Sequence, residues 1–170
     1  ASIEAILVAS YSMINREVNA RYVNLKIIEN DEFIFFSNYQ SSKSVEFNSH
    51  DQITAVIFWN KINSQIRIKA NIKKTSKEYN NEYFKNRSKK KNALAISSNQ
   101  SKEIDSFNEV EEKYNNVLKN DDLERCPDYW GGFSFKPYYF EFWEGSDIRL
   151  NKRTIYKLKK NIWIKSFLEP

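Results

Sequence analysis

Cysteine and histidine are almost absent from the 170-residue chain, which contains Cys126 and His50 and no other residue of either type. A single cysteine cannot build a disulfide framework or a thiolate metal cluster. A single histidine argues against a zinc centre or a histidine-based catalytic triad. We therefore expect no metal site. We expect Cys126 to pack in the fold without acting as an activated thiolate, and His50 to lie on the surface.

Glycine and proline are also scarce, with three residues of each. Because these residues mark sharp turns, most connections must instead use asparagine, aspartate and serine. The three glycines, Gly131, Gly132 and Gly145, do not form a glycine-rich phosphate loop. Any nucleotide-like cofactor must therefore be held by side chains and by backbone groups at strand ends.

No apolar run approaches transmembrane length, and the apolar first eleven residues carry Glu4 and lack the basic start of a signal peptide. We therefore expect a cytoplasmic protein with no membrane partner. The net charge is +5, and part of this excess lies between Lys85 and Lys91. Such a basic run is typical of a solvated surface or of an anion site, and phosphate-bearing small molecules and nucleic acid fit it equally.

Apolar residues are plentiful, at 41% hydrophobic and 15% aromatic, which predicts one packed domain over residues 1–170. Helices are expected at 41–47, with Val45 and Phe47 facing inward, from 76 through Phe84, and at 104–118. Turns are expected at 37–38 and 130–132. Consecutive strands without helices between them favour an antiparallel sheet or barrel. Apolar and alternating runs predict these strands at 3–9, 18–28, 33–36, 53–59, 66–72, 138–143, 155–158 and 162–168.

Basic and polar segments recur beside the predicted strand ends. In the first half they are Arg21-Tyr22-Val23-Asn24-Leu25-Lys26, Phe35-Phe36-Ser37-Asn38 and Ser41-Ser42-Lys43. The later ones are Tyr83-Phe84-Lys85-Asn86-Arg87, Asn99-Gln100-Ser101, Trp130-Gly131-Gly132, Glu141-Phe142-Trp143-Glu144-Gly145 and Arg149-Leu150-Asn151-Lys152-Arg153. Together, in this order, they resemble the pyridoxamine 5'-phosphate oxidase family from about Ala5 to Pro170. The Trp-Gly-Gly and Glu-Phe-Trp elements and the following Arg-Leu-x-x-Arg are the most specific parts.

The resemblance implies a mainly β protein with flanking helices, namely an antiparallel split β-barrel that binds FMN at the interface of a homodimer. By position, Arg21 and Lys43 would hold the FMN phosphate, with Ser42 beside them. The flavin would be lined by Tyr22, Val23, Asn24, Leu25, Lys26, Phe36 and Ser37, and its site would be completed by Gln65, Gln100, Ser101, Trp143 and Arg153. Ionic donors of this kind suit a phosphate dianion, and strands with a tryptophan suit a flat ring.

The same resemblance implies a substrate site for phosphorylated B6 vitamers, with dioxygen as electron acceptor. Lys26, Tyr83, Arg87 and Lys91 would hold the substrate phosphate. Arg149 and Asn151 would lie at the reacting end and are the expected catalytic residues. The expected reaction is oxidation of pyridoxamine or pyridoxine 5'-phosphate to pyridoxal 5'-phosphate with release of hydrogen peroxide.

Three positions depart from the family pattern. Ser42 stands where an arginine usually assists the cofactor phosphate, Lys91 where a serine is usual, and Asn151 where a histidine is usual. These departures keep open a flavoprotein of the same fold with another substrate. A basic, aromatic-rich barrel that binds nucleic acid is the alternative from a different class, although we expect no nucleic-acid partner. Family members also usually begin earlier, which predicts that this chain is trimmed or lacks a lid segment.

Overall fold

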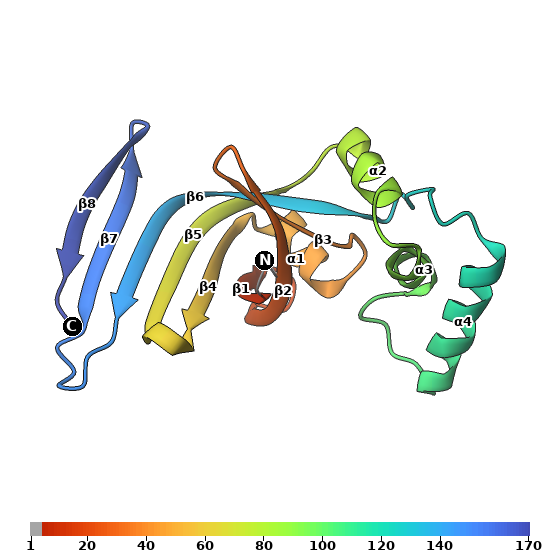
Figure 1. The fold of residues 1–170 in the computed structure, drawn as a ribbon, viewed down its shortest axis with the longest axis horizontal. Coiled ribbons are helices and arrows are strands. Elements are labelled where there is room, and N and C mark those ends of the chain that lie inside the picture. Colours follow the sequence, from red (N-terminus) through yellow and green to blue (C-terminus); the bar gives the residue numbers. More distant parts are fainter. Residues whose placement is uncertain (1–4) are drawn as a thin grey trace. The chain divides into compact units, whose positions relative to one another are not determined.

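The computed structural model describes residues 5–170, so the start of the strand predicted at 3–9 lies outside the described part. The described chain forms two compact units, drawn in Figure 1. Unit 1 contains residues 5–35, 46–73 and 134–170, and unit 2 contains residues 36–45 and 74–133. The expectation of a single domain over residues 1–170 stays a prediction.

One eight-stranded sheet dominates the fold, in the order β3-β2-β1-β4-β5-β6-β7-β8. Strand β3 also pairs with β6, and this second pairing closes β1 to β6 into a barrel from which β7 and β8 extend. The β1–β2, β1–β4, β2–β3, β4–β5, β6–β7 and β7–β8 pairs are antiparallel. The expected antiparallel split barrel is confirmed. The strands are β1 (Ala5–Ser12), β2 (Glu17–Glu29), β3 (Glu32–Asn38), β4 (Gln52–Trp59), β5 (Ser64–Lys74), β6 (Trp130–Glu144), β7 (Lys152–Lys159) and β8 (Ile162–Leu168).

Alternation along the strands supplies the barrel core. In β5, Ile66, Ile68, Ala70 and Ile72 are buried and the residues between them are not, as the period-two pattern predicts. Two hairpins close without glycine. The β2–β3 turn uses Asn30 and Asp31 with φ of 49° and 64°, and the β7–β8 turn likewise has positive φ at both central residues. Positive φ at both positions matches the right-handed twist of the paired strands.

Four α-helices and one short 3-10 turn complete the described part of the chain: α1 (Ser42–Ser49), α2 (Lys77–Lys85), α3 (Lys89–Ser97), α4 (Phe107–Asn120) and η1 (Asn60–Ile62). Ser76 caps α2 by accepting a hydrogen bond from the Tyr79 N–H at 3.2 Å, so the expected helix start is confirmed. No helix among residues 5–170 has the length and apolarity needed to cross a membrane.

The first helix departs from expectation in the direction of one side chain. Phe47 is buried as predicted, but Val45 is 43% exposed, so its predicted inward position is wrong. The buried face of α1 is instead formed by Ser44 and Glu46 together with Phe47. Hydrogen bonds satisfy Ser44 and Glu46, which lets polar residues occupy positions that the apolar pattern assigned to valine.

Both predicted turns are wrong, and α3 was not foreseen. Strand β3 continues through Ser37 and Asn38, because Gln100 accepts hydrogen bonds from both residues. Residues 130–132 open strand β6, because Gly131 permits close approach of neighbouring atoms and does not turn the chain. A Cβ on Gly131 would lie 2.2 Å from the Tyr39 hydroxyl. Helix α3 begins with lysines, so it lacks the apolar periodicity that would have predicted a helix. The last helix was expected to begin at Ile104, but this residue lies before α4.

Candidate functional site

Strand β2 carries six of the expected cofactor residues in a row, and its pleat divides their side chains between two faces. Val23 and Leu25 are buried in the barrel core, whereas Tyr22 is 72% exposed. Successive side chains on a strand point to opposite faces, so the six side chains cannot line one ligand together. A bulge between Leu25 and Ile27 redirects the strand at Lys26.

Arg21 lies in a polar network within unit 1. Its guanidinium donates to Glu46 at 2.8 Å and to the Ser10 hydroxyl at 2.5 Å. Ser10 in turn donates to the same Glu46 oxygen, and Asn19 donates to the other Glu46 oxygen at 3.0 Å. The Glu46 side chain is only 7% exposed. The charge of Arg21 is therefore already paired with a buried carboxylate.

A second buried carboxylate, Glu141 on β6, holds two arginines. Arg153 on β7 donates to Glu141 through Nε at 2.9 Å and Nη2 at 2.8 Å. Arg67 on β5 and the Tyr139 hydroxyl donate to the other carboxylate oxygen. Burial acts to raise the pKa of Glu141, but hydrogen bonds from Arg153, Tyr139 and Arg67 outweigh it and hold that pKa below its usual value.

Trp143 lies directly opposite Arg153 across the β6–β7 pair, so two expected flavin contacts are neighbours. The next turn is fixed to η1, because the Gly145 N–H donates to the Asn63 carbonyl at 3.0 Å. A Cβ on Gly145 would lie 2.1 Å from the Asn63 amide nitrogen and 2.8 Å from the Trp143 ring. A side chain at this position would require the Asn63 side chain and the Trp143 ring to shift. Gln65 lies at the start of β5, in the same unit.

The loop between β6 and β7 presents the two residues expected at the reacting end. Asn151 accepts a hydrogen bond from the Ser146 N–H at 3.0 Å through its side-chain oxygen, which closes the loop. Arg149 has a φ of 60°, in the left-handed region that a non-glycine residue rarely adopts. Ile148 and Leu150 on either side of it are 81% and 68% exposed. Asn151 thus shapes the loop that carries Arg149.

In unit 2, the start of α1 brings Lys43 beside a buried serine pair. Lys43 donates to the Ser41 hydroxyl at 3.1 Å, and Ser41 and Ser44 both donate to the Asn38 carbonyl. Ser42 is exposed. Lys43 is thereby placed at the end of β3, beside two hydroxyl groups.

Gln100 is fixed at the end of β3 by its side-chain oxygen. That oxygen accepts from the Ser37 hydroxyl at 3.0 Å and from the Asn38 N–H at 3.2 Å. Ser101 follows with a φ of 72°, again in the left-handed region. Ser37 and Gln100, two residues that the resemblance assigned to one cofactor site, are therefore in direct contact.

An aromatic stack joins strands β3 and β6 with helix α2 in unit 2. The ring of Phe36 stacks on Tyr83 with centroids 3.7 Å apart and lies 5.2 Å from Trp130. Arg87 lies over the Trp130 ring at 4.9 Å. The expected flavin residue Phe36 and the expected substrate residue Tyr83 therefore share one stack.

Arg87 is held by neutral partners. It donates to the Lys91 carbonyl at 2.8 Å and to the Asn92 side-chain oxygen at 3.2 Å, so Arg87 and Lys91 are brought together. Burial lowers the pKa of Arg87 and raises that of Tyr83, whose hydroxyl stays protonated at neutral pH. Arg87 thus lies beside the Lys91 backbone, and a guanidinium is a donor suited to a phosphate.

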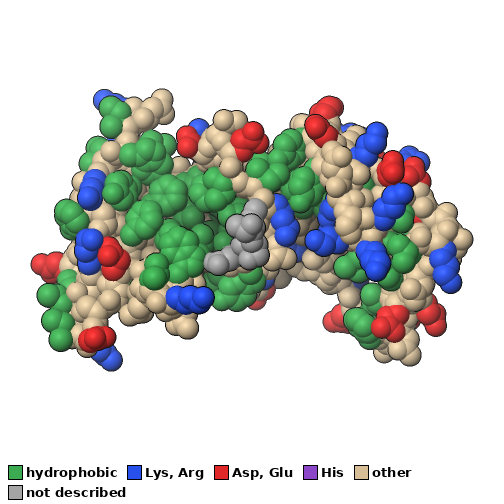
Figure 2. All heavy atoms as spheres, viewed as in Figure 1, with side chains coloured by type: hydrophobic (Ala, Val, Ile, Leu, Met, Phe, Trp, Pro, Cys, Tyr) green, Lys and Arg blue, Asp and Glu red, His purple; other side chains and the backbone are tan. Residues whose placement is uncertain are grey.

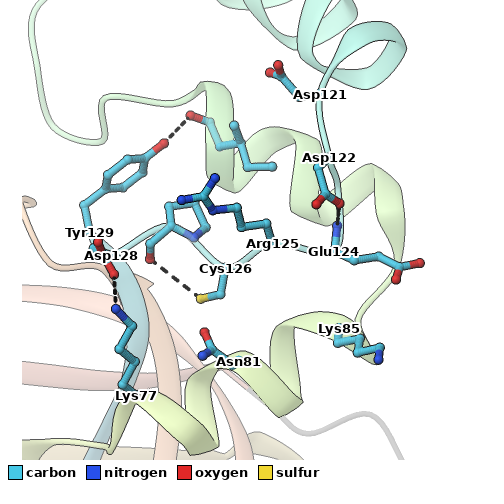
Figure 3. A pocket seen from close by; sticks show the side chains of 12 residues that line it. Lys77, Asn81, Lys85, Asp121, Asp122, Glu124, Arg125, Cys126, Asp128 and Tyr129 are labelled. Atoms are coloured by element: carbon cyan, nitrogen blue, oxygen red, sulfur yellow. Dashed lines mark hydrogen bonds and ion pairs between the residues drawn. The ribbon is translucent and has the colours of Figure 1, made fainter.

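A cavity of about 770 Å³ in unit 2 contains none of the expected site residues in its lining. Figure 3 shows its walls, where Lys77 pairs with Asp128 at 2.8 Å and the Tyr129 hydroxyl donates to the Ile96 carbonyl. Cys126 donates weakly to the Pro127 carbonyl, and burial raises the pKa of its thiol to about 11. This thiol is protonated at neutral pH, as expected for a packed cysteine.

Sequence reasoning missed the carboxylates that hold the arginines. Glu46 and Glu141 are both buried, yet the resemblance gave neither a role. One signal was available for Glu141, which is a single acidic residue inside the otherwise apolar and aromatic run from Tyr138 to Trp143. A charge at such a position predicts a partner of opposite charge on a neighbouring strand.

Comparison with solved structures identifies the fold. The chain superimposes with a TM-score of 0.89 on PhzG from Burkholderia lata 383, solved with tetrahydrophenazine-1-carboxylic acid, covering all of this chain and 84% of that one at 22% identity. It matches a pyridoxamine 5'-phosphate oxidase-related, FMN-binding protein from Nostoc punctiforme with a TM-score of 0.80, 10% identity, and 100% and 89% coverage. The fold is the split β-barrel of this FMN-binding class.

Sequence comparison then identifies the family. The chain is 36% identical over 154 residues to the pyridoxine/pyridoxamine 5'-phosphate oxidase of Leptospira biflexa, covering 89% of this chain and 73% of that protein. It is 38% identical over 147 residues to the Cytophaga hutchinsonii enzyme, with 84% and 68% coverage. Residues 130–170 match the pyridoxine 5'-phosphate oxidase C-terminal dimerisation region. The chain belongs to the pyridoxine/pyridoxamine 5'-phosphate oxidase family.

Proposed function

We propose that this protein is an FMN-dependent oxidase that converts pyridoxamine or pyridoxine 5'-phosphate to pyridoxal 5'-phosphate, with dioxygen as acceptor and hydrogen peroxide as product. The observation that carries the proposal is the family match, which extends over 89% of the chain. Family membership favours a flavoprotein over the basic nucleic-acid-binding barrel that composition alone left open.

The donor set of this chain fits FMN. In unit 1, Arg21 supplies hydrogen-bond donors held by Glu46, the lysine at the β2 bulge supplies a cation, and Trp143 supplies an aromatic surface beside Arg153. In unit 2, Lys43 and Gln100 are held in place at the end of β3. These are the groups that a phosphate and a flat heteroaromatic ring require. When bound, FMN supplies the redox chemistry by accepting a hydride and passing electrons to dioxygen.

The substrate phosphate is assigned to Tyr83, Arg87 and Lys91. Arg87 is oriented by two carbonyl-type acceptors and by Trp130, so its remaining donors are fixed before a ligand arrives. Lys91, which replaces the usual serine, keeps a donor and adds positive charge. Such binding holds a group remote from the chemistry and orients the reacting carbon.

Arg149 and Asn151 are assigned to the reacting end of the substrate. A guanidinium is a fixed positive charge, so Arg149 orients the substrate and stabilises developing charge without moving a proton. Asn151 does not titrate, and its oxygen is committed to the Ser146 N–H. We therefore assign Asn151 to shaping the Arg149 loop, where the family usually has a histidine.

The proposal includes a homodimer. Residues 130–170 match a dimerisation region, and Figure 2 shows hydrophobic side chains gathered over the strands of unit 1 that Figure 1 labels β4 to β7. Exposed apolar surface of this kind marks an association site. Light scattering that gives the mass of two chains supports this assignment, and a monomer that binds FMN tightly contradicts it.

Turnover is the decisive experiment for the proposed function. The purified protein is expected to be yellow, to release FMN on denaturation, and to produce pyridoxal 5'-phosphate and peroxide from both phosphorylated vitamers. A yellow protein that is inert toward both vitamers would favour the alternative, a split-barrel flavoprotein with another substrate. That alternative draws support from Asn151 and Lys91, the departures nearest the expected substrate.

A further inference from the structure

Glu141 is an acidic residue at an interior position of β6. Its neighbours Phe140 and Phe142 are aromatic, and only 4% of its side chain is exposed. Moving a carboxylate out of water is strongly unfavourable unless charged partners and hydrogen bonds compensate it. Because burying this carboxylate is unfavourable for folding, its presence in the core needs an explanation other than filling space.

Both oxygens of Glu141 are fully used. One accepts two hydrogen bonds from Arg153, and the other accepts from Arg67 and from the Tyr139 hydroxyl. The four donors come from β5, β6 and β7, so the carboxylate fixes side chains from three adjacent strands. The result is one negative charge between two arginines.

The consequence for Arg153 is a fixed orientation. An arginine has five N–H donors. Arg153 commits three of them, two to Glu141 and one to the Glu169 carbonyl at 3.0 Å, and five minus three leaves two. The Arg153 side chain is 28% exposed, and Trp143 is its cross-strand neighbour.

We propose that Glu141 is a positioning residue that holds the Arg153 guanidinium in the orientation required for flavin binding. This inference rests on the proposed FMN site. Glu141 acts through Arg153 and does not touch the cofactor itself. The role of Arg67 is to satisfy the second carboxylate oxygen, so that Glu141 stays ionised and its first oxygen stays directed at Arg153.

A double-mutant cycle tests the inference with FMN affinity as the readout. Apoprotein of the wild type, Glu141→Gln, Arg153→Ala and the double variant is titrated with FMN, and urea unfolding of each apoprotein checks folding. We expect Glu141→Gln to weaken FMN binding at least tenfold and the double variant to bind no worse than Arg153→Ala, because the two residues act as a unit. Glu144→Gln is the matched control. It removes a carboxylate of the same strand that is 51% exposed and forms an ion pair with Lys152. The FMN affinity of this variant should change less than twofold.

Electrostatics alone predicts the opposite sign, because removing a negative charge favours an anionic ligand. FMN affinity of Glu141→Gln that is unchanged or higher, or losses that add in the double variant, therefore overturns the inference while the FMN site stands. If the wild type itself binds no FMN, the proposed function fails and the inference with it. If Glu141→Gln does not fold, Tyr139→Phe replaces it in the cycle. This variant removes one donor to Glu141 and should weaken FMN binding twofold to threefold, and no change would overturn the inference.

Discussion

Arginine side chains are held in two different ways in the two units of this protein. In unit 1, Arg21 and Arg153 donate to the buried carboxylates Glu46 and Glu141. In unit 2, Arg87 donates to a backbone carbonyl and to the Asn92 amide, and it lies over an aromatic ring. Among residues 5–170 the structure contains no ion pair to Arg87.

Both arrangements fix the guanidinium, but they differ in how much positive charge remains for a ligand. A carboxylate fixes an arginine strongly but cancels its charge, so the pair attracts an anion only weakly. Neutral acceptors and a ring fix the guanidinium while leaving its full charge for a ligand. Under the proposed function, Arg153 of unit 1 needs a fixed orientation beside a bound cofactor, whereas Arg87 of unit 2 needs its charge to attract a substrate phosphate.

The largest expected effect is on stability in unit 1. Arg21→Ala leaves the buried Glu46 carboxylate without its cation, and breaking a buried pair in this way costs about 3–5 kcal/mol. Urea unfolding measures the loss. Adding Glu46→Gln to Arg21→Ala should recover most of it, because no buried charge is then left unpaired. An equal loss in the single and double variants would contradict the charge argument.

Next in size is the effect of Arg87→Ala in unit 2, which should appear in substrate binding. No carboxylate is left behind, so we expect a small stability loss of roughly 1 kcal/mol from the ring contact and hydrogen bonds. The KM for a phosphorylated vitamer should rise about tenfold to a hundredfold with little change in kcat, because phosphate binding is uniform between ground and transition states. A collapse of kcat at constant KM would reject the phosphate assignment.

Tyr83→Phe isolates one hydroxyl of the same cluster. The ring stack on Phe36 is retained, so stability should not change. Loss of one phosphate hydrogen bond should raise KM by roughly threefold to tenfold. Because burial raises the pKa of Tyr83, the hydroxyl of the wild type stays a donor across pH 7 to 9, and KM should show no step from this group in that range. Steady-state assays of both proteins across pH 7 to 9 check both statements.

The smallest effect is expected for Asn151→His, which restores the usual residue of the family. A histidine ring nitrogen can accept the Ser146 N–H that Asn151 accepts now, so stability should stay within about 0.5 kcal/mol. FMN affinity should change less than twofold, because Asn151 is not assigned to the cofactor. A new pH dependence in the substrate steps is expected, since histidine titrates near pH 6.5. An inert wild type with an active Asn151→His variant would show that the chain has drifted from the family reaction.

Strands could be predicted well because each carries its own periodic signal. The alternation of Ile66, Ile68, Ala70 and Ile72 defines one buried face without reference to any other segment. The two turn predictions were wrong because polar and glycine residues have more than one use. Asn38 continues a strand because its N–H donates to the Gln100 side chain, and Gly131 leaves room for the Tyr39 side chain. Neither partner is near in the sequence, so local sequence could not predict these contacts.

Site residues could be grouped from the sequence only through family resemblance. The roles assigned to Gln65, Ser101 and the residues of β2 stay predictions, although the structure does bring Ser37 to Gln100, Arg87 to Lys91 and Trp143 to Arg153.

By itself, the sequence determined a mainly β protein built from antiparallel strands, because short-range periodicity is a property of each segment alone. Only the tertiary structure decided which arginines have their charge balanced by a buried carboxylate. Arg21 and Glu46 are 25 residues apart and Arg67 and Glu141 are 74 apart, and nothing in their local context specifies these pairs. Long-range strand and helix packing places them together, and the low polarizability of the packed interior then makes the pairing obligatory.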